Sequence, residues 1–175
     1  MDNLHRKVAF IGNVGSGKTT IVNQLSSTEA LNTDVESSLD IGKRFTTVGI
    51  DFGHIQLGDD MSISLYGVPG QRRFSFIWDF VKDGLWAIVL LIKNGDQESL
   101  DEMEHLIEYF DINENSTCTI GITHAEGAEG NEFSKSVFHL MKSYNLNFPI
   151  YHIDARKKES ALLLMNTLIA IKETE

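Results

Sequence analysis

Cysteine, proline and long apolar runs are all scarce in this chain of 175 residues. The single cysteine, Cys118, excludes an internal disulfide, which fits a reducing compartment, and its apolar surroundings predict a buried, unreactive thiol. Only two prolines occur, and no linker or low-complexity stretch interrupts the chain, so we expect a single domain over residues 1–175. The longest apolar run, residues 85–92, is too short to span a membrane.

Positive charge is also in the minority, because the formal net charge is −10. A nucleic acid is therefore not an expected partner, since its phosphate backbone would repel the chain. The first residues match neither a signal peptide nor a myristoylation motif, and the last four contain no prenylation cysteine. We expect a cytoplasmic protein without a membrane segment or lipid anchor.

Hydrophobic periodicity predicts strands that alternate with helices. Strands are expected at residues 8–11, 47–57, 61–66, 85–92, 117–123 and 148–153. Helices are expected at residues 74–83, 100–110, 133–144 and 160–171, and around Ile21, Val22 and Leu25, which share one face. This order is typical of α/β proteins with a mostly parallel sheet, and the adjacent second and third strands predict one antiparallel edge strand. Ligands on such sheets bind at the carboxyl ends of the strands.

The segment Gly12-Asn13-Val14-Gly15-Ser16-Gly17-Lys18-Thr19 matches the phosphate-loop motif and lies between a predicted strand and helix. Its glycines permit backbone angles that aim N–H groups at an anion, and the N-terminus of the helix favours anions. Lys18 puts a cation on the terminal phosphates, and the Thr19 hydroxyl is short enough to ligate Mg²⁺. The motif predicts a nucleoside triphosphate site with phosphate contacts from Asn13, Val14, Gly15, Ser16, Gly17, Lys18, Thr19 and Thr20.

Four later segments complete a recognisable order of motifs. They are Thr46-Thr47-Val48-Gly49-Ile50-Asp51-Phe52, Tyr66-Gly67-Val68-Pro69-Gly70-Gln71-Arg72-Arg73-Phe74, Gly121-Ile122-Thr123-His124-Ala125-Glu126 and Ile153-Asp154-Ala155-Arg156. Together with the phosphate loop they resemble the Ras-like small GTPases, most closely the divergent prokaryotic branch that includes the polarity GTPases of gliding bacteria. The resemblance covers essentially the whole chain. It implies a P-loop NTPase fold with a mixed six-stranded sheet and about five helices on both faces.

The resemblance also implies roles around the γ-phosphate. Thr47 would join Thr19 in the magnesium shell and contact the γ-phosphate, and the N–H of Gly70 would sense that phosphate. Gln71 would orient the attacking water and act with Lys18 in catalysis, because phosphoryl transfer is mostly positioning and electrostatics. The aspartate usual three residues before Gly70 is replaced by Gly67. We therefore expect weaker coupling to magnesium rather than loss of the metal.

The residues expected to read the base depart from the family pattern. Thr123, His124 and Glu126 stand where the family has Asn, Lys and Asp. Glu126 keeps the carboxylate that accepts bonds from N1–H and the N2 amino group of guanine, a donor pair that adenine lacks. Ala155 would meet the guanine carbonyl through its N–H, and Arg156 follows it in the loop. GTP or GDP is the expected ligand, with weakened selectivity.

Two groups of residues near the expected γ-phosphate bear on hydrolysis and partners. One of three arginines near the expected γ-phosphate could act in cis as an arginine finger. We favour the alternative that these arginines are solvated loop residues, because nothing in the sequence fixes the direction of their side chains. The branched side chain of Val14 would crowd an incoming glutamine or arginine and predicts slow unaided hydrolysis. Part of an aromatic run should pack in the core and leave one or two rings exposed as a partner-binding candidate. The arginines are Arg44, Arg72 and Arg73, and the aromatic residues are Phe74, Phe76, Trp78 and Phe80.

We therefore expect a GTP-binding molecular switch that slowly hydrolyses GTP to GDP and phosphate and signals to a protein partner through its switch loops. Two alternatives stay open. One is a degenerate module that binds nucleotide without hydrolysis, which Gly67 and Val14 support. The other is a P-loop ATPase or kinase, which would need an arginine-bearing lid and an acceptor site, and no segment is long enough for either.

Overall fold

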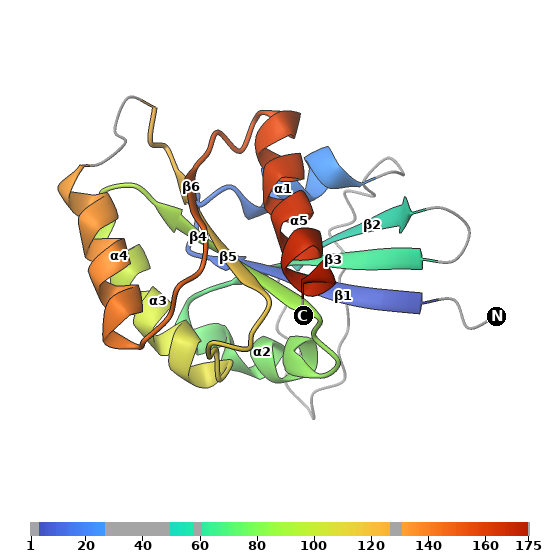
Figure 1. The fold of residues 1–175 in the computed structure, drawn as a ribbon, viewed down its shortest axis with the longest axis horizontal. Coiled ribbons are helices and arrows are strands. Elements are labelled where there is room, and N and C mark those ends of the chain that lie inside the picture. The colour runs from blue at the N-terminus through green and yellow to red at the C-terminus, as the bar shows by residue number, and fades with distance from the viewer. Residues whose placement is uncertain (1–3, 27–49, 58–60, 127–130, 175) are drawn as a thin grey trace.

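The computed structural model describes residues 4–26, 50–57, 61–126 and 131–174 (Figure 1). Six strands form one sheet in the order β2-β3-β1-β4-β5-β6. Only β2 and β3 pair antiparallel among the described strands, so β2 is the antiparallel edge strand that the sequence predicts. The strands are β1 (Leu4–Gly12), β2 (Asp51–Leu57), β3 (Met61–Pro69), β4 (Ala87–Lys93), β5 (Cys118–Thr123) and β6 (Ile150–His152).

Helices cover both faces of the sheet, as expected for this class. Helices α1 (Lys18–Leu25) and α5 (Lys158–Glu173) lie on one face, and α2 (Ser75–Lys82), α3 (Gln97–Tyr109) and α4 (Glu132–Ser143) lie on the other (Figure 1). Two helices begin at side-chain caps, because Asp96 accepts a bond from Glu98 N and Asn131 accepts one from Ser134 N. Within the described residues, no helix combines the length and apolar character needed to cross a bilayer.

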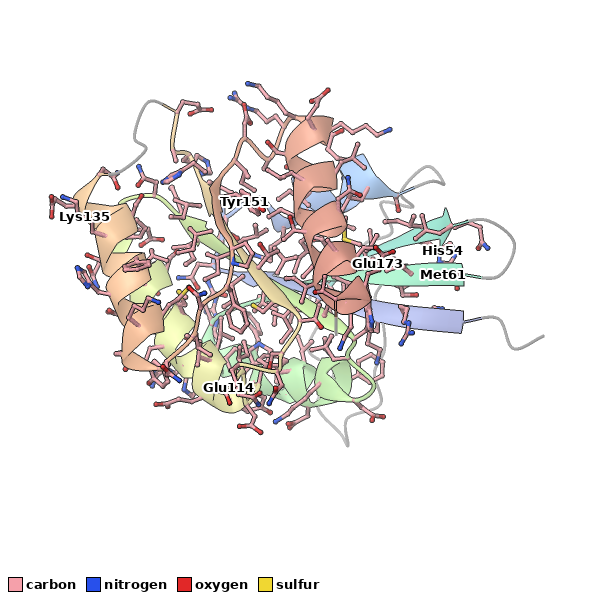
Figure 2. All side chains as sticks on the ribbon, in the orientation of Figure 1. His54, Met61, Glu114, Lys135, Tyr151 and Glu173 are labelled. Carbon is pink, nitrogen blue, oxygen red and sulfur yellow. The ribbon has the colours of Figure 1, made fainter. Side chains whose placement is uncertain are left out.

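Apolar side chains fill the space between the sheet and each helical layer (Figure 2). Strand β4 is buried at residues 87–92, as its continuous apolar sequence predicts. Cys118 is fully buried, which confirms the prediction of a buried thiol, and this burial raises the pKa of the thiol far above its usual range. Polar side chains such as Lys135 lie on the outer faces of the helices (Figure 2).

The aromatic run after the second predicted switch segment divides between the core and the surface. A 3₁₀ turn over Arg72–Phe74 precedes α2, so the regular helix begins one residue later than predicted. Trp78 is fully buried, and its indole N–H donates a 2.8 Å hydrogen bond to Pro69 O. Phe80 is 50% exposed. The expected division of this run is confirmed.

The topology gathers loop residues at one edge of the sheet. Strands β1, β3, β4, β5 and β6 are parallel, so their carboxyl ends share this edge. Because β2 is antiparallel, its first residue, Asp51, also lies there, opposite Gly67 of β3. Strand β1 has β3 on one side and β4 on the other, which is the switch point where ligands bind in α/β sheets.

Candidate nucleotide-binding site

The glycines of the phosphate loop are required for two different reasons. Gly15 and Gly17 have φ angles of 76° and 97°, in the left-handed region that side chains disfavour. Gly12 is required for space instead, because a Cβ atom there would lie 2.3 Å from Leu91 O on β4. The expectation that all three supply unusual backbone angles therefore holds for Gly15 and Gly17 and is corrected for Gly12.

The ammonium group of Lys18 lies across this loop. Its Nζ donates to Gly12 O at 2.7 Å and to Asn13 O at 2.8 Å. Burial lowers the pKa of Lys18 from 10.5 to about 8, and the Asp51 carboxylate partly opposes this shift. The loop thus holds one cation among main-chain groups, where an anion would gain most from it.

The Thr19 hydroxyl contacts a carboxylate whose role was not predicted from the sequence. Its Oγ1 donates a 2.7 Å hydrogen bond to Asp51 Oδ2. A Cβ atom at Gly67 would lie 2.8 Å from the same Oδ2, so Asp51 reaches the space beside the position of the missing aspartate. One signal was available, because the antiparallel pairing expected of these two consecutive strands places Asp51 opposite Gly67. Hydroxyl and carboxylate oxygens are ligands that Mg²⁺ accepts.

One cavity of about 360 Å³ joins the phosphate loop to the loops after β5 and β6. All five predicted base-binding residues line it, and so do five of the predicted phosphate-binding residues. The lining residues are Gly15, Gly17, Lys18, Thr19, Thr20, Thr123, His124, Glu126, Asp154, Ala155 and Arg156.

Close packing fixes the base end of this cavity relative to the phosphate loop. A Cβ atom at Gly17 would lie 2.7 Å from the Ala155 methyl carbon, so the absent side chain lets the two loops approach. Thr123 is buried, and its Oγ1 lies 3.1 Å from His124 Nδ1. The Glu126 carboxylate accepts a 2.8 Å bond from Arg156 Nη2. Direct contacts therefore join Thr123 to His124 and Glu126 to Arg156.

Other predicted residues lie near the loop but do not line the cavity. Asn13 Oδ1, Ser16 Oγ and Gln71 Oε1 are buried without a hydrogen-bond partner among the described residues. The N–H of Gly70 donates a 3.0 Å bond to Gly12 O, and Val14 is 73% exposed.

The arginines considered as catalytic fingers have other contacts. Arg72 Nε lies 3.8 Å from Glu102 Oε2 on α3. The Arg73 guanidinium lies over the Phe74 ring, 4.7 Å from its centroid. Arg44 and Thr47 lie outside the described residues. Both described arginines after Gln71 thus have contacts with other side chains of the protein in this structure.

Comparison with known proteins supports the nucleotide chemistry of this site. A family model described as "50S ribosome-binding GTPase" matches residues 7–124, which is more than half of the chain. ADP-ribosylation factor-like protein 6 of Danio rerio is 28% identical over 111 residues, covering 60% of this chain and 53% of that protein. The chain thus spans about half the length of this curated relative. With its phosphate loop, six-stranded mixed sheet and matching family model, the chain belongs to this family of P-loop GTPases within the small GTPase superfamily.

Proposed function

We propose that residues 1–175 form a single G domain that acts as a GTP-binding molecular switch, hydrolyses GTP slowly and signals to a protein partner. The observation that carries this proposal is the continuous cavity from Lys18 to Glu126. The same cavity is lined by the Lys18 ammonium, which would bind phosphates, and by the Glu126 carboxylate, which would bind guanine. We also place the chain in the divergent prokaryotic branch of the superfamily, where Asp51 opposite Gly67 accounts for the missing aspartate.

The phosphate end of the cavity would bind the triphosphate through the loop and the first turn of α1. Lys18 would exchange its bonds to Gly12 O and Asn13 O for phosphate oxygens. Gly15 and Gly17 would aim main-chain N–H groups at the phosphates, with Thr19 and Thr20 beside them. Asn13, Val14 and Ser16 would contribute main-chain groups, since the side chains of Asn13 and Ser16 are buried and Val14 points to solvent.

The residues beside the phosphate end fit a magnesium ion. Thr19 Oγ1 and Asp51 Oδ2 lie 2.7 Å apart and belong to the oxygen class that magnesium prefers. Thr19 would bind the ion directly, Asp51 would hold one of its waters, and Thr47 would complete the shell. Bound magnesium would neutralise charge on the terminal phosphates.

The base end would select guanine. The Glu126 carboxylate would accept bonds from N1–H and the N2 amino group, and the main-chain N–H of Ala155 would donate to the guanine carbonyl. The His124 ring is exposed at the cavity and would lie against the base. Adenine would leave the carboxylate unpaired, and unpaired polar groups are what make such sites selective.

Slow hydrolysis follows from the arrangement around Gln71. Its Oε1 is buried without a partner among the described residues, so the side chain must move before it can orient a water. Gly70 must likewise release Gly12 O before its N–H can reach a γ-phosphate. We propose that this rearrangement is the switching motion and that a partner protein recognises the segment from Gly70 to the exposed ring of Phe80.

Hydrolysis and base choice test this proposal directly. In single-turnover assays we expect the rate constant for GTP hydrolysis to lie far below roughly one per second. Gln71→Leu should lower this rate constant further, by about tenfold or more. We expect GTP to displace a labelled guanine nucleotide more effectively than ATP. The labelled nucleotide also allows the affinity of each variant to be checked.

The strongest alternative is a module that binds nucleotide without hydrolysing it, which the buried Oε1 atom of Gln71 favours. If the wild type and Gln71→Leu hydrolyse GTP at the same background rate, the alternative is correct. If ATP displaces the label as well as GTP does, the assignment of guanine is wrong.

A further inference from the structure

Two carboxylates lie at the base end of the cavity and come from separate loops. Glu126 follows β5, and Asp154 follows β6. Like charges at such a site repel each other and would push the two loops apart. Arg156 lies between them, and its Nη2 donates to Glu126 Oε1 and to Asp154 Oδ2, each at 2.8 Å. One guanidinium therefore bridges both acidic groups.

The position of Arg156 is fixed by additional contacts. Its Nε donates to Asp154 Oδ1 at 2.8 Å, and its main-chain N–H donates to the same oxygen at 3.0 Å. Gln24 Nε2 of α1 donates to Arg156 O at 2.9 Å. The Asp154 side chain is only 12% exposed, so the guanidinium is attached to a well-held carboxylate. These bonds have the forked geometry that makes arginine–carboxylate pairs directional.

Asp154 and Arg156 stabilise each other's charged forms. Hydrogen bonds from Arg156 hold the pKa of the Asp154 carboxyl well below its usual range, and Asp154 in turn raises the pKa of the Arg156 guanidinium. Arg156 cancels one of the two negative charges. The cluster therefore keeps one net negative charge, which suits a ligand edge that carries only hydrogen-bond donors.

Glu126 has a particular need for such a contact. Its side chain is 62% exposed and is one methylene longer than the aspartate usual at this position, so it has more rotamers to lose on binding. Arg156 engages Oε1, while no described donor reaches Oε2. The bridge would thus order the carboxylate in advance and leave acceptor capacity for guanine, which lowers the cost of binding.

We propose that Arg156 is a positioning residue for guanine selectivity, which it produces by bridging Asp154 to Glu126 and orienting the Glu126 carboxylate toward N1–H and the N2 amino group. This inference rests on the proposed function, because it presupposes that Glu126 reads the base. An isolated exposed ion pair contributes little to stability. Arg156 instead acts through orientation, because three bonds fix it on Asp154 and a fourth joins it to Glu126 on the other loop.

Equilibrium competition against a labelled GTP tests the proposal with three competitors. GTP presents N1–H and the N2 amino group, ITP lacks the amino group, and ATP lacks both donors. We expect Arg156→Met to weaken GTP binding by about tenfold and to reduce the GTP-to-ITP and GTP-to-ATP preferences, while ATP affinity changes by less than about twofold. Arg156→Lys, which keeps the charge but loses the fork, should give intermediate preferences.

Two further variants separate orientation from charge and from folding. Lys157→Met removes the neighbouring cation, which does not line the cavity, and should leave both the GTP-to-ITP and the GTP-to-ATP preference unchanged. In a Glu126→Ala background, Arg156→Met should reduce the GTP-to-ATP preference no further. If Arg156→Met fails to fold, the GTP-to-ITP and GTP-to-ATP preferences of Arg156→Lys test the proposal instead.

The outcomes distinguish this inference from the function on which it rests. If the wild type shows no preference for GTP, the proposed function fails and the inference fails with it. If the wild type prefers GTP and the Arg156 variants keep that preference, only the inference is overturned. A parallel fall in GTP and ATP affinity would show a purely structural role and would also overturn it.

Discussion

Lys18 combines a buried ammonium with two main-chain acceptors and a nearby carboxylate. Burial lowers its pKa to about 8, which is close enough to neutrality for its charge to change in ordinary buffers. Triphosphate binding requires the charged form and would draw the pKa back up. The protein without nucleotide loses this proton as the pH rises through about 8, so binding at higher pH must first restore it.

Nucleotide affinity should therefore fall as the pH rises. We expect the affinity for Mg·GTP to decrease by about tenfold between about pH 7 and pH 9, as measured by calorimetry. Lys18→Arg supplies the control, because a guanidinium stays charged over this range. Its affinity is expected to be lower overall but to depend less on pH. Parallel pH profiles for the two proteins would contradict this reading of Lys18.

The site residues that could be predicted from the sequence lie in short segments, each of which has a recognisable local motif. The phosphate loop was recognisable because its glycines, Lys18 and Thr19 are consecutive and share one local geometry. The close approach of Leu91 to Gly12 and the contact of Asp51 with Thr19 depend on strands distant in the sequence. Such contacts follow from sheet register, which periodicity alone does not specify.

At the scale of elements, the β2–β3 hairpin offers two places for one carboxylate. Asp51 and Gly67 are directly paired, and a Cβ atom at Gly67 would lie 2.8 Å from both Cβ and Oδ2 of Asp51. The two strands therefore cannot both carry an aspartate there without movement. The aspartate at residue 51 therefore requires a residue without a side chain, glycine, at position 67.

Moving the carboxylate across this hairpin tests its role in metal binding. We expect Asp51→Gly to raise the Mg²⁺ concentration needed for half-maximal GTP binding by about tenfold, the order found for groups that support metal ligands indirectly. Adding Gly67→Asp to Asp51→Gly should restore much of the loss, because the aspartate then occupies the cleared space. Gly67→Asp alone should lower the unfolding temperature. Unchanged magnesium dependence in Asp51→Gly would exclude the proposed role.

Element type was easier to predict than element length. The apolar run at residues 85–92 and the helical faces led to the correct strands and helices. Strand β1 extends back to Leu4, four residues before the predicted start, and includes the polar residues His5, Arg6 and Lys7. Their backbones gain hydrogen bonds by pairing with β3, a stabilisation that does not depend on apolar side chains.

The domain as a whole encloses the thiol of Cys118 between the sheet and the helices. Cys118 belongs to the core under α2, α3 and α4 and is inaccessible to solvent. A thiol reagent can reach it only when the surrounding layers separate. Its modification rate therefore reports the opening of the domain.

Nucleotide binding should slow this modification. At a free Mg·GTP concentration of about 100 times its dissociation constant, we expect the domain to be stabilised by about 2.7 kcal/mol. The Cys118 modification rate should fall by roughly a hundredfold, as followed by absorbance with a chromogenic disulfide reagent. Cys118→Ser establishes the background absorbance. Modification within the mixing time, or at a rate independent of nucleotide, would contradict the coupling of site and core.

The hydrogen bond from the Trp78 indole to Pro69 O provides the protein with an intrinsic optical reporter. Pro69 immediately precedes Gly70, so displacement of that peptide would change the polarity around a fluorophore in the core. The chain has two tryptophans, and replacement of Trp86 by phenylalanine would leave emission from Trp78 alone. The sequence thus supplies a label-free signal for following the segment beside the triphosphate site in real time.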